Sequence, residues 1–152
     1  MSQYGERAEA LFYQGYNCSQ SVAAAFAGEM GLTEEQVLRM SAGFGAGMGR
    51  LREVCGAFSG MVFAFSTIYA TGRPEDKSRL YAEVQALAAQ YRTRAGGSIV
   101  CRELLGLSQA EGSPLASERT ADYYRKRPCP KLVHLAADLL SDYLNTHPRP
   151  AR

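Results

Sequence analysis

The sequence predicts an all-α fold, a compact single-domain bundle of about six to eight helices. Apolar residues recur three and four positions apart in most segments, the spacing of one face of an α-helix. Capping residues, glycines and prolines separate these segments. No alternating apolar and polar pattern is long enough to predict a strand. At 152 residues, the chain is long enough to build a hydrophobic core of its own.

Seven segments are expected to be helical, and an eighth short helix is expected around residues 123–124. Asn17 is expected to cap the second helix, and Thr33 with Gln36 forms a capping box before the third. Residues 43–50, with the sequence GFGAGMGR, are expected to form a loop because of their glycine density, with a backbone cradle for an anion or cluster as the alternative. The seven expected helices cover residues 2–15, 18–30, 33–41, 51–71, 75–94, 98–105 and 130–146.

We expect one helical domain over residues 1–146 and a frayed tail over residues 147–152. One stretch, residues 54–72, holds 19 residues without a charge, about the length of a membrane span. Its Gly56 and Gly60 form a GxxxG pair, which also occurs in membrane helix dimers. Because the stretch is rich in serine, threonine and glycine, we expect a buried central helix of a bundle and no stable membrane insertion.

The composition excludes several broad classes of protein. Hydrophobic residues make up 46% of the chain and charged residues 21%, which is too apolar for a disordered chain. The 17 basic and 15 acidic residues give a net charge of only +2, so nothing predicts nucleic-acid binding. The N-terminal residues include Glu6, Arg7 and Glu9, where a signal peptide needs an apolar core. We therefore expect a cytoplasmic protein whose thiols stay reduced.

Four cysteines, Cys18, Cys55, Cys101 and Cys129, are the residues best suited to chemistry. They lie 37, 46 and 28 residues apart, so the chain has neither a thioredoxin-type CxxC nor the spacing of a zinc knuckle. Cys18, Cys101 and Cys129 fall at expected helix N-termini, where free N–H groups and the helix dipole favour a thiolate. Cys18 and Cys129 are therefore expected to have pKa values below the ~8.5 of a free cysteine. An inert, buried thiol is the alternative for each cysteine.

The segment CGAFSG, residues 55–60, places Gly56 and Gly60 on one helical face with Ala57 beside them. Small residues let another backbone, or a cofactor, approach closely, and plain helix packing explains the pattern equally well. If the cysteines share a site, this helix is its natural centre. We therefore expect all four sulfur atoms to line one pocket, with residues 43–50 near its rim. A Gly60→Leu change is expected to block that pocket and leave the helix intact.

The CGAxxG motif, with one cysteine upstream and two downstream, resembles the C_GCAxxG_C_C family of small proteins presumed to be redox-active. The resemblance runs from residue 18 to about residue 140 and includes all four cysteines and the complete motif. It implies a redox role, often alongside membrane-transport genes. A related arrangement occurs in the split-Soret cytochromes, where such cysteines are associated with a non-haem iron centre. This chain has no CxxCH, so the haem part of that resemblance does not apply.

Three functions remain open from the sequence. The first is a redox protein whose cysteines together bind a metal or an iron–sulfur cluster. The second is a metal-free thiol–disulfide protein, and the third is a transport-associated binding module with structural cysteines. A redox partner protein and a homodimer are compatible with all three, and His134 is expected to be a surface or core residue rather than a ligand. The candidate redox or metal residues are Cys18, Cys55, Cys101 and Cys129, with Gly56, Ala57 and Gly60 as supporting residues.

Overall fold

The computed structural model describes residues 2–150, and over that range the chain is an all-α bundle, as predicted. It has ten α-helices in this range rather than six to eight, because one expected helix is divided and the glycine-rich loop contains a helical turn. The described residues form no strand, although Val54 and Val100 make an isolated antiparallel β-bridge. The α-helices are α1 (Gln3–Tyr13), α2 (Cys18–Ala25), α3 (Ala27–Met30), α4 (Glu34–Met40), α5 (Gly45–Met48), α6 (Gly56–Tyr69), α7 (Lys77–Ala95), α8 (Cys101–Leu104), α9 (Ala121–Lys126) and α10 (Cys129–Thr146), and the 3₁₀-helices are η1 (Ala42–Phe44) and η2 (Pro74–Asp76).

Several expected helix boundaries move, including that of α8, which begins at Cys101 and not at residue 98, and local backbone geometry explains two of the changes. The helix expected over residues 18–30 is divided at Phe26, whose φ of −105° and ψ of 14° interrupt the helical repeat. The long apolar helix begins only at Gly56, because Arg50 and Arg52 have left-handed φ values of 65° and 60°. This second change matters for the site, because it moves a helix N-terminus to the residue after Cys55.

The predicted capping residues at the N-terminal end of the bundle are confirmed. Asn17 and Thr33 each accept a hydrogen bond from a backbone N–H three residues on, and the glutamine there bonds back to the cap N–H. Gly31 ends α3 with a φ of 72°. Each such cap satisfies N–H groups that a helix leaves unpaired and contributes about 1 kcal/mol. The Asn17 cap also fixes the start of α2, and hence the position of Cys18.

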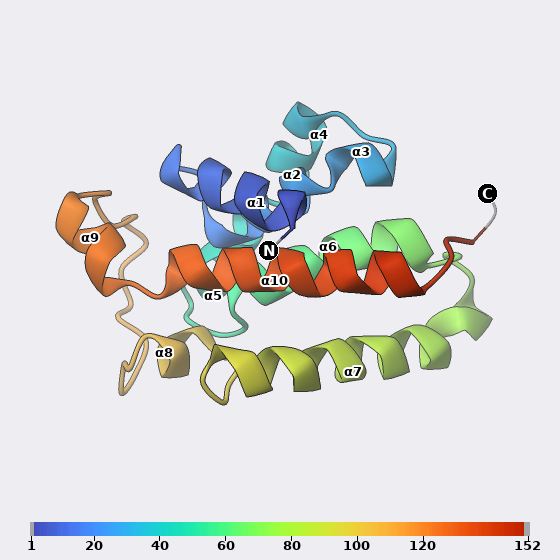
Figure 1. Ribbon diagram of the computed structural model, residues 1–152. Helices are drawn as coiled ribbons and strands as arrows, with labels where there is room; N and C mark the ends of the chain where they lie inside the picture. The colour runs from blue at the N-terminus through green and yellow to red at the C-terminus, as the bar shows by residue number, and fades with distance from the viewer. Residues whose placement is uncertain (1, 151–152) are drawn as a thin grey trace.

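The helices pack in layers around α10 (Figure 1). α10 contacts α1, α2, α6 and α7, and α2 packs against α6. α6 is the uncharged stretch noted above, and nine of its fourteen residues are buried, which confirms it as a central helix of the bundle. Between residues 2 and 150, no helix combines the length and the apolar character that crossing a membrane requires. Segments α8 and α9 lie together at one end of the molecule, and the α6–α7 connection lies at the other.

Helices from the two ends of the sequence are joined by a polar cluster. His134 of α10 contacts Glu9 of α1 through Nδ1 at 2.7 Å, and its Nε2 lies 3.4 Å from Asp138. The Ser2 hydroxyl, which caps α1, donates to Asp138 at 2.6 Å. His134 is therefore part of the α1–α10 contact, in agreement with its interpretation as a structural residue.

The segment that follows α10 contacts the body of the bundle within the described range. The His147 ring stacks on Tyr143 with 3.7 Å between ring centroids, and its carbonyl accepts a hydrogen bond from Tyr69 at 2.9 Å. Arg149 pairs with Glu29. Residues 151–152, which complete the tail expected to be frayed, lie outside the described residues.

Candidate functional site

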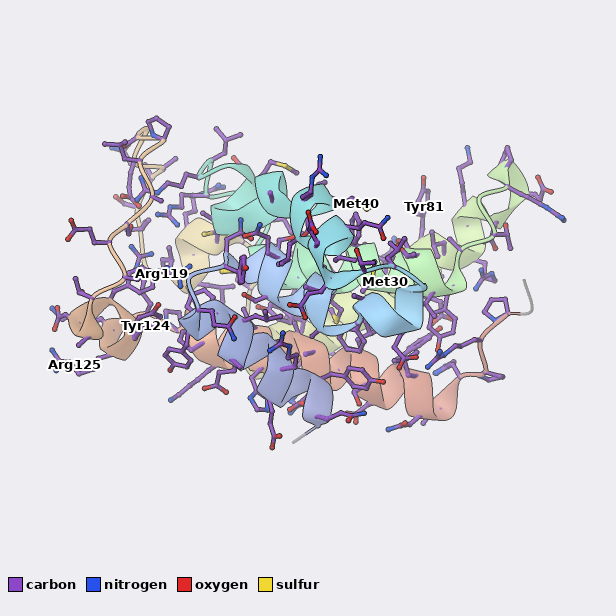
Figure 2. The ribbon with its side chains drawn as sticks, turned by 90° about the horizontal axis from the view of Figure 1, so that it is seen from above. Met30, Met40, Tyr81, Arg119, Tyr124 and Arg125 are labelled. Carbon is purple, nitrogen blue, oxygen red and sulfur yellow. The ribbon has the colours of Figure 1, made fainter. Side chains whose placement is uncertain are left out.

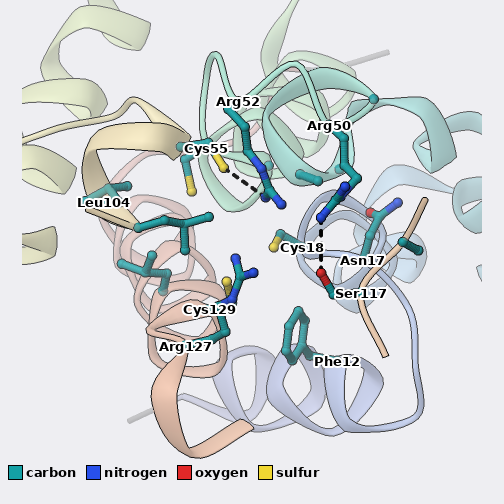
Figure 3. A pocket seen from close by; sticks show the side chains of 18 of the residues that line it. Phe12, Asn17, Cys18, Arg50, Arg52, Cys55, Leu104, Ser117, Arg127 and Cys129 are labelled. Carbon is teal, nitrogen blue, oxygen red and sulfur yellow. Dashed lines mark hydrogen bonds between the residues drawn. The ribbon is translucent and has the colours of Figure 1, made fainter. Parts of the chain in front are cut away.

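A cavity of about 300 Å³ lies at the end of the bundle where α2, α6, α8 and α10 begin, and all four cysteines line it (Figure 3). Cys18, Cys101 and Cys129 are the first residues of α2, α8 and α10. Cys55, which the sequence analysis placed inside a helix, is the residue that immediately precedes α6. Each thiol is thus held at a helix N-terminus, where unpaired backbone N–H groups stabilise negative charge.

Two glycines of the CGAFSG segment let α6 approach α2 closely. A Cβ atom at Gly56 would lie 3.0 Å from the Cβ of Cys18. A Cβ atom at Gly60 would lie 2.5 Å from the carbonyl oxygen of Ser19 and 3.0 Å from its Cα. Contacts this short are incompatible with any larger side chain at the present helix separation. The glycines therefore set the distance between Cys18 and the start of α6.

The three supporting residues have different positions. Gly56 lines the cavity, whereas Gly60 lies under the Ser19 backbone and is absent from the cavity wall. The expectation that Gly60→Leu blocks the cavity is therefore wrong, because the new side chain would meet the α2 backbone first; that the α6 helix itself stays intact remains a prediction. Ala57 is fully buried, and its backbone N–H and that of Phe58 hydrogen-bond to the Cys55 sulfur.

A short backbone pairing holds the segments that carry Cys55 and Cys101 together. The N–H of Cys55 donates to the carbonyl of Ile99 at 2.7 Å, and the N–H of Cys101 donates to Glu53 at 2.6 Å. These bonds flank the isolated bridge between Val54 and Val100. Two cysteines that are 46 residues apart in the sequence are thereby fixed on one wall of the cavity. Nothing in the local sequence pattern signalled this pairing.

The glycine-rich segment passes along the cavity rim in an unusual conformation. Gly45, Ala46 and Gly49 line the cavity, as was expected of this segment. A Cβ atom at Gly47 would lie 2.7 Å from both the Arg52 Cα and the Cys101 Cβ, so only glycine fits there. Left-handed backbone at a non-glycine residue costs about 1–3 kcal/mol, and such residues concentrate at functional sites. Three non-glycine residues of the segment, and Arg52 just after it, have positive φ: Ala46, Met48, Arg50 and Arg52.

Cys129 carries the most acidic thiol of the four. A hydrogen bond from Cys18, with smaller effects of Arg127, Arg119 and Arg52, lowers the pKa of Cys129 to about 7 against the effect of burial. The same hydrogen bond, together with burial, raises the pKa of Cys18 well above its usual value. The expectation of two acidic thiols is therefore confirmed for Cys129 and wrong for Cys18. When Cys129 is a thiolate, Cys18 keeps its proton and shares it.

Cys55 and Cys101 are more protected thiols. Burial raises the pKa of Cys55, although a 3.3 Å hydrogen bond with the Tyr91 hydroxyl opposes the change. Burial also raises the pKa of Cys101, although Arg52, with its Nη1 atom 3.6 Å from the sulfur, opposes it. Both thiols therefore remain protonated at neutral pH in the structure described here.

Four arginines line the cavity, and one of them, Arg119, reaches it from the irregular segment between α8 and α9. Arg119 donates to the backbone carbonyls of Phe12 and Tyr16 at 2.8 and 2.9 Å, and its guanidinium lies 4.1 Å from the Phe12 ring centroid. Figure 2 shows Arg119 beside α9, at the end of the molecule that holds the site. Sequence reasoning missed Arg119 because it belongs to an irregular segment. The four arginines are Arg50, Arg52, Arg119 and Arg127.

The irregular segment between α8 and α9 covers one side of the cavity. Arg50 donates to the Ser113 carbonyl at 2.9 Å and to the Ser117 hydroxyl at 3.2 Å (Figure 3). Glu111 of the same segment pairs with Arg52 at 3.0 Å and with Arg50 at 3.3 Å. The covering segment is therefore held by polar contacts to the two arginines of the rim.

The donor atoms in the cavity suit sulfur-based redox chemistry. In the described part of the chain, no three His, Cys, Asp or Glu side chains are grouped closely enough to hold one metal ion. Cys18 and Cys129 face the same cavity, and the pKa of Cys129 is lowered to about 7 while that of Cys18 is raised. An acidic thiol next to a protonated one is compatible with thiol–disulfide exchange.

Comparison with known proteins agrees with the site. No curated protein and no solved structure matches the chain. A family model described as "Putative redox-active protein (C_GCAxxG_C_C)" matches residues 16–143. This range contains the CGAxxG motif at residues 55–60 and all four cysteines. Since the match covers most of the chain, this protein belongs to the C_GCAxxG_C_C family.

Proposed function

We propose that the protein is a thiol–disulfide redox protein in which Cys129 and Cys18 are the reacting pair. The observation that carries this proposal is that both cysteines open a helix on the wall of one cavity, with the pKa of Cys129 lowered to about 7. A thiol with a pKa near the ambient pH is the most effective attacking group in disulfide exchange, because it is both ionised and nucleophilic.

The reaction would proceed in two steps. The Cys129 thiolate attacks one sulfur of a substrate disulfide, which forms a mixed disulfide and releases the other half of the substrate as a thiolate. Cys18 then loses its proton to solvent and attacks the Cys129 sulfur. This forms the Cys18–Cys129 disulfide and releases the second half of the substrate. The protein loses two electrons, the substrate gains two, and an external dithiol returns the protein to its reduced form.

Arginines near the pair support the first step. Arg127, Arg119 and Arg52 each lower the pKa of Cys129, so they stabilise the thiolate before attack. Cys55 and Cys101 keep their protons because of burial, which leaves them as a second, less reactive pair of thiols in the same cavity. In this proposal they are not required for the Cys18–Cys129 cycle.

The second candidate function is an iron–sulfur redox protein, and it is favoured by the position of all four cysteines around one cavity. Cysteine thiolates are the usual ligands of such clusters, and arginines offset the negative charge of a cluster with four thiolates. Cys18, Cys55, Cys101 and Cys129 would hold the group, and it would supply one-electron transfer. A single metal ion fits less well, because no three of these side chains are close enough to share one.

One experiment separates these functions and the third, a binding module with structural cysteines. Protein purified without oxygen is analysed for iron, for sulfide and for visible absorption, and its reactive thiols are counted before and after treatment with a disulfide oxidant. Thiol–disulfide function predicts a colourless sample that reversibly loses two thiols on oxidation. A brown sample with iron and sulfide supports the cluster, and a colourless sample with unreactive thiols supports the structural reading.

Paired serine variants give the matched control. Cys18→Ser with Cys129→Ser is expected to abolish the reversible oxidation, and Cys55→Ser with Cys101→Ser is expected to retain it. Loss of two-thiol oxidation in both double variants would contradict a dedicated Cys18–Cys129 pair. Loss of iron in both double variants would instead support the four-cysteine cluster.

A further inference from the structure

The cavity wall carries far more positive than negative charge. Among the described residues that line it, four are arginines and none is aspartate or glutamate. One carboxylate from outside the wall, that of Glu111, reaches Arg50 and Arg52. A thiolate at Cys129 balances only one of the remaining charges. Buried arginines are normally paired, so this wall has room for a further anion.

Arg50 and Arg52 are positioned as receptors for a carboxylate. The Arg52 residue is 4% exposed, and its Nε and Nη2 atoms both lie within 3.1 Å of one Glu111 oxygen. The Arg50 side chain is 12% exposed and contacts the other Glu111 oxygen. Two guanidinium groups thus share one carboxylate, and both sit in left-handed backbone that aims them at the same point. Arginine is suited to such planar, multi-point recognition.

Glu111 is the solvent-accessible side of this contact. Its side chain is 38% exposed, and it belongs to the irregular segment that covers the cavity rather than to a helix. Glu111 is therefore a solvent-accessible carboxylate held by two largely buried arginines. An external carboxylate could take its place without rearrangement of the bundle.

We infer that Arg50 and Arg52 form a binding site for a small carboxylate-bearing molecule, and that Glu111 occupies this site until the ligand displaces it. The inference deepens the proposed function and rests on it in one respect: it names the substrate as a carboxylate-bearing disulfide. The cavity of about 300 Å³ is at the small end of the range for ligand sites, which restricts the ligand to a few carbons on each side of the sulfur atoms.

The binding arm of the test uses protein that cannot react. In metal-free Cys18→Ser/Cys129→Ser protein, calorimetric titration with 3,3′-dithiodipropionate measures binding without exchange. Arg50→Gln in this background is expected to weaken binding about tenfold or more, and Glu111→Gln is expected to strengthen it several-fold. The uncharged bis(2-hydroxyethyl) disulfide and the cationic cystamine serve as probes of the same disulfide core.

The controls separate a binding role from a structural one. Arg73→Gln removes an exposed arginine at the opposite end of the molecule and is expected to leave the affinity unchanged. Arg52→Gln is a second variant, accepted only where circular dichroism shows a folded bundle. The opposite signs expected for Arg50→Gln and Glu111→Gln distinguish charge recognition from general loosening of the site.

Equal affinities for the three probes, or no binding even with Glu111→Gln, would overturn the inference. The variant protein could bind the dicarboxylate selectively while wild-type protein fails to reduce it. That result would support the carboxylate site and contradict the thiol–disulfide function. Selective binding followed by reduction would support both.

Discussion

The glycine at position 60 provides the sharpest test of how the site is assembled. Gly60→Ala adds one carbon that would lie 2.5 Å from the Ser19 carbonyl oxygen and 3.0 Å from the Ser19 Cα. Both atoms are backbone, so no side chain can rotate away, and α2 must move from α6. Because Ser19 follows Cys18, that movement is expected to disturb the Cys18–Cys129 hydrogen bond as well.

The size of the effect follows from two opposing contributions. Overpacking in a rigid contact costs about 3 kcal/mol at the upper end of the usual range. Alanine in place of glycine inside a helix returns about 1 kcal/mol. The expected net loss is about 2 kcal/mol in the free energy of unfolding, equivalent to a fall of about 4–8 °C in Tm for a domain of this size.

Thermal unfolding followed by circular dichroism measures this loss, and the alkylation rate of Cys129 against pH reports the disturbed pair. Gly28→Ala is the matched control, because Gly28 lies in α3 and a Cβ atom there would have nothing within 4 Å. That variant is expected to be neutral or slightly stabilising. A Gly60→Ala protein as stable as wild type, with an unchanged Cys129 profile, would refute the close α2–α6 contact as the determinant of the site.

Further predictions concern single side chains. Cys18→Ala is expected to raise the pKa of Cys129, seen as a shift of its alkylation profile to higher pH, and Cys18→Ser is expected to restore part of the difference because it keeps a donor. Since the folded pKa of Cys129 is depressed, its stabilising effect is present above pH ~8.5 and lost as pH falls through about 7. The difference in unfolding free energy between wild type and Cys129→Ser should therefore decrease as the pH is lowered from ~8.5 to about 7. A difference that stays constant with pH would contradict the depressed pKa. Tyr91→Phe removes the hydrogen bond to Cys55 and is expected to cost about 1 kcal/mol in denaturant unfolding. Asn17→Ala removes the cap of α2 and is expected to cost about 1 kcal/mol as well, whereas no loss would mean that packing alone fixes the helix start.

Sequence reasoning succeeded where the determinants are local. Asn17 and Thr33 begin helices through contacts within a few residues, so the pattern contains the information. Apolar spacing likewise predicts the buried α6. The expected helix boundaries also placed Cys18, Cys101 and Cys129 correctly at helix N-termini.

It failed where the determinants are contacts distant in sequence. The left-handed backbone of Arg50 and Arg52 follows from the close fit of the segment to Cys101, which no local pattern reveals. The raised pKa of Cys18 depends on its contact with Cys129, a residue of another helix. Arg119 reaches the cavity from an irregular segment without periodicity. A position at a helix N-terminus is therefore not enough to predict the acidity of a thiol. The neighbouring thiols must be known as well.

The central place of α10 has a consequence for synthesis of the protein. A chain that emerges from the ribosome N-terminus first presents Cys18, Cys55 and Cys101 well before the helix that contacts α1, α2, α6 and α7. Until residues from Cys129 onward have emerged, the activated thiolate is missing and the remaining thiols lack their enclosing wall. A stalled or truncated chain is therefore expected to carry only ordinary thiols. On the proposed function, reactivity would arise only with completion of the last helix, so an incomplete chain would lack the reacting pair.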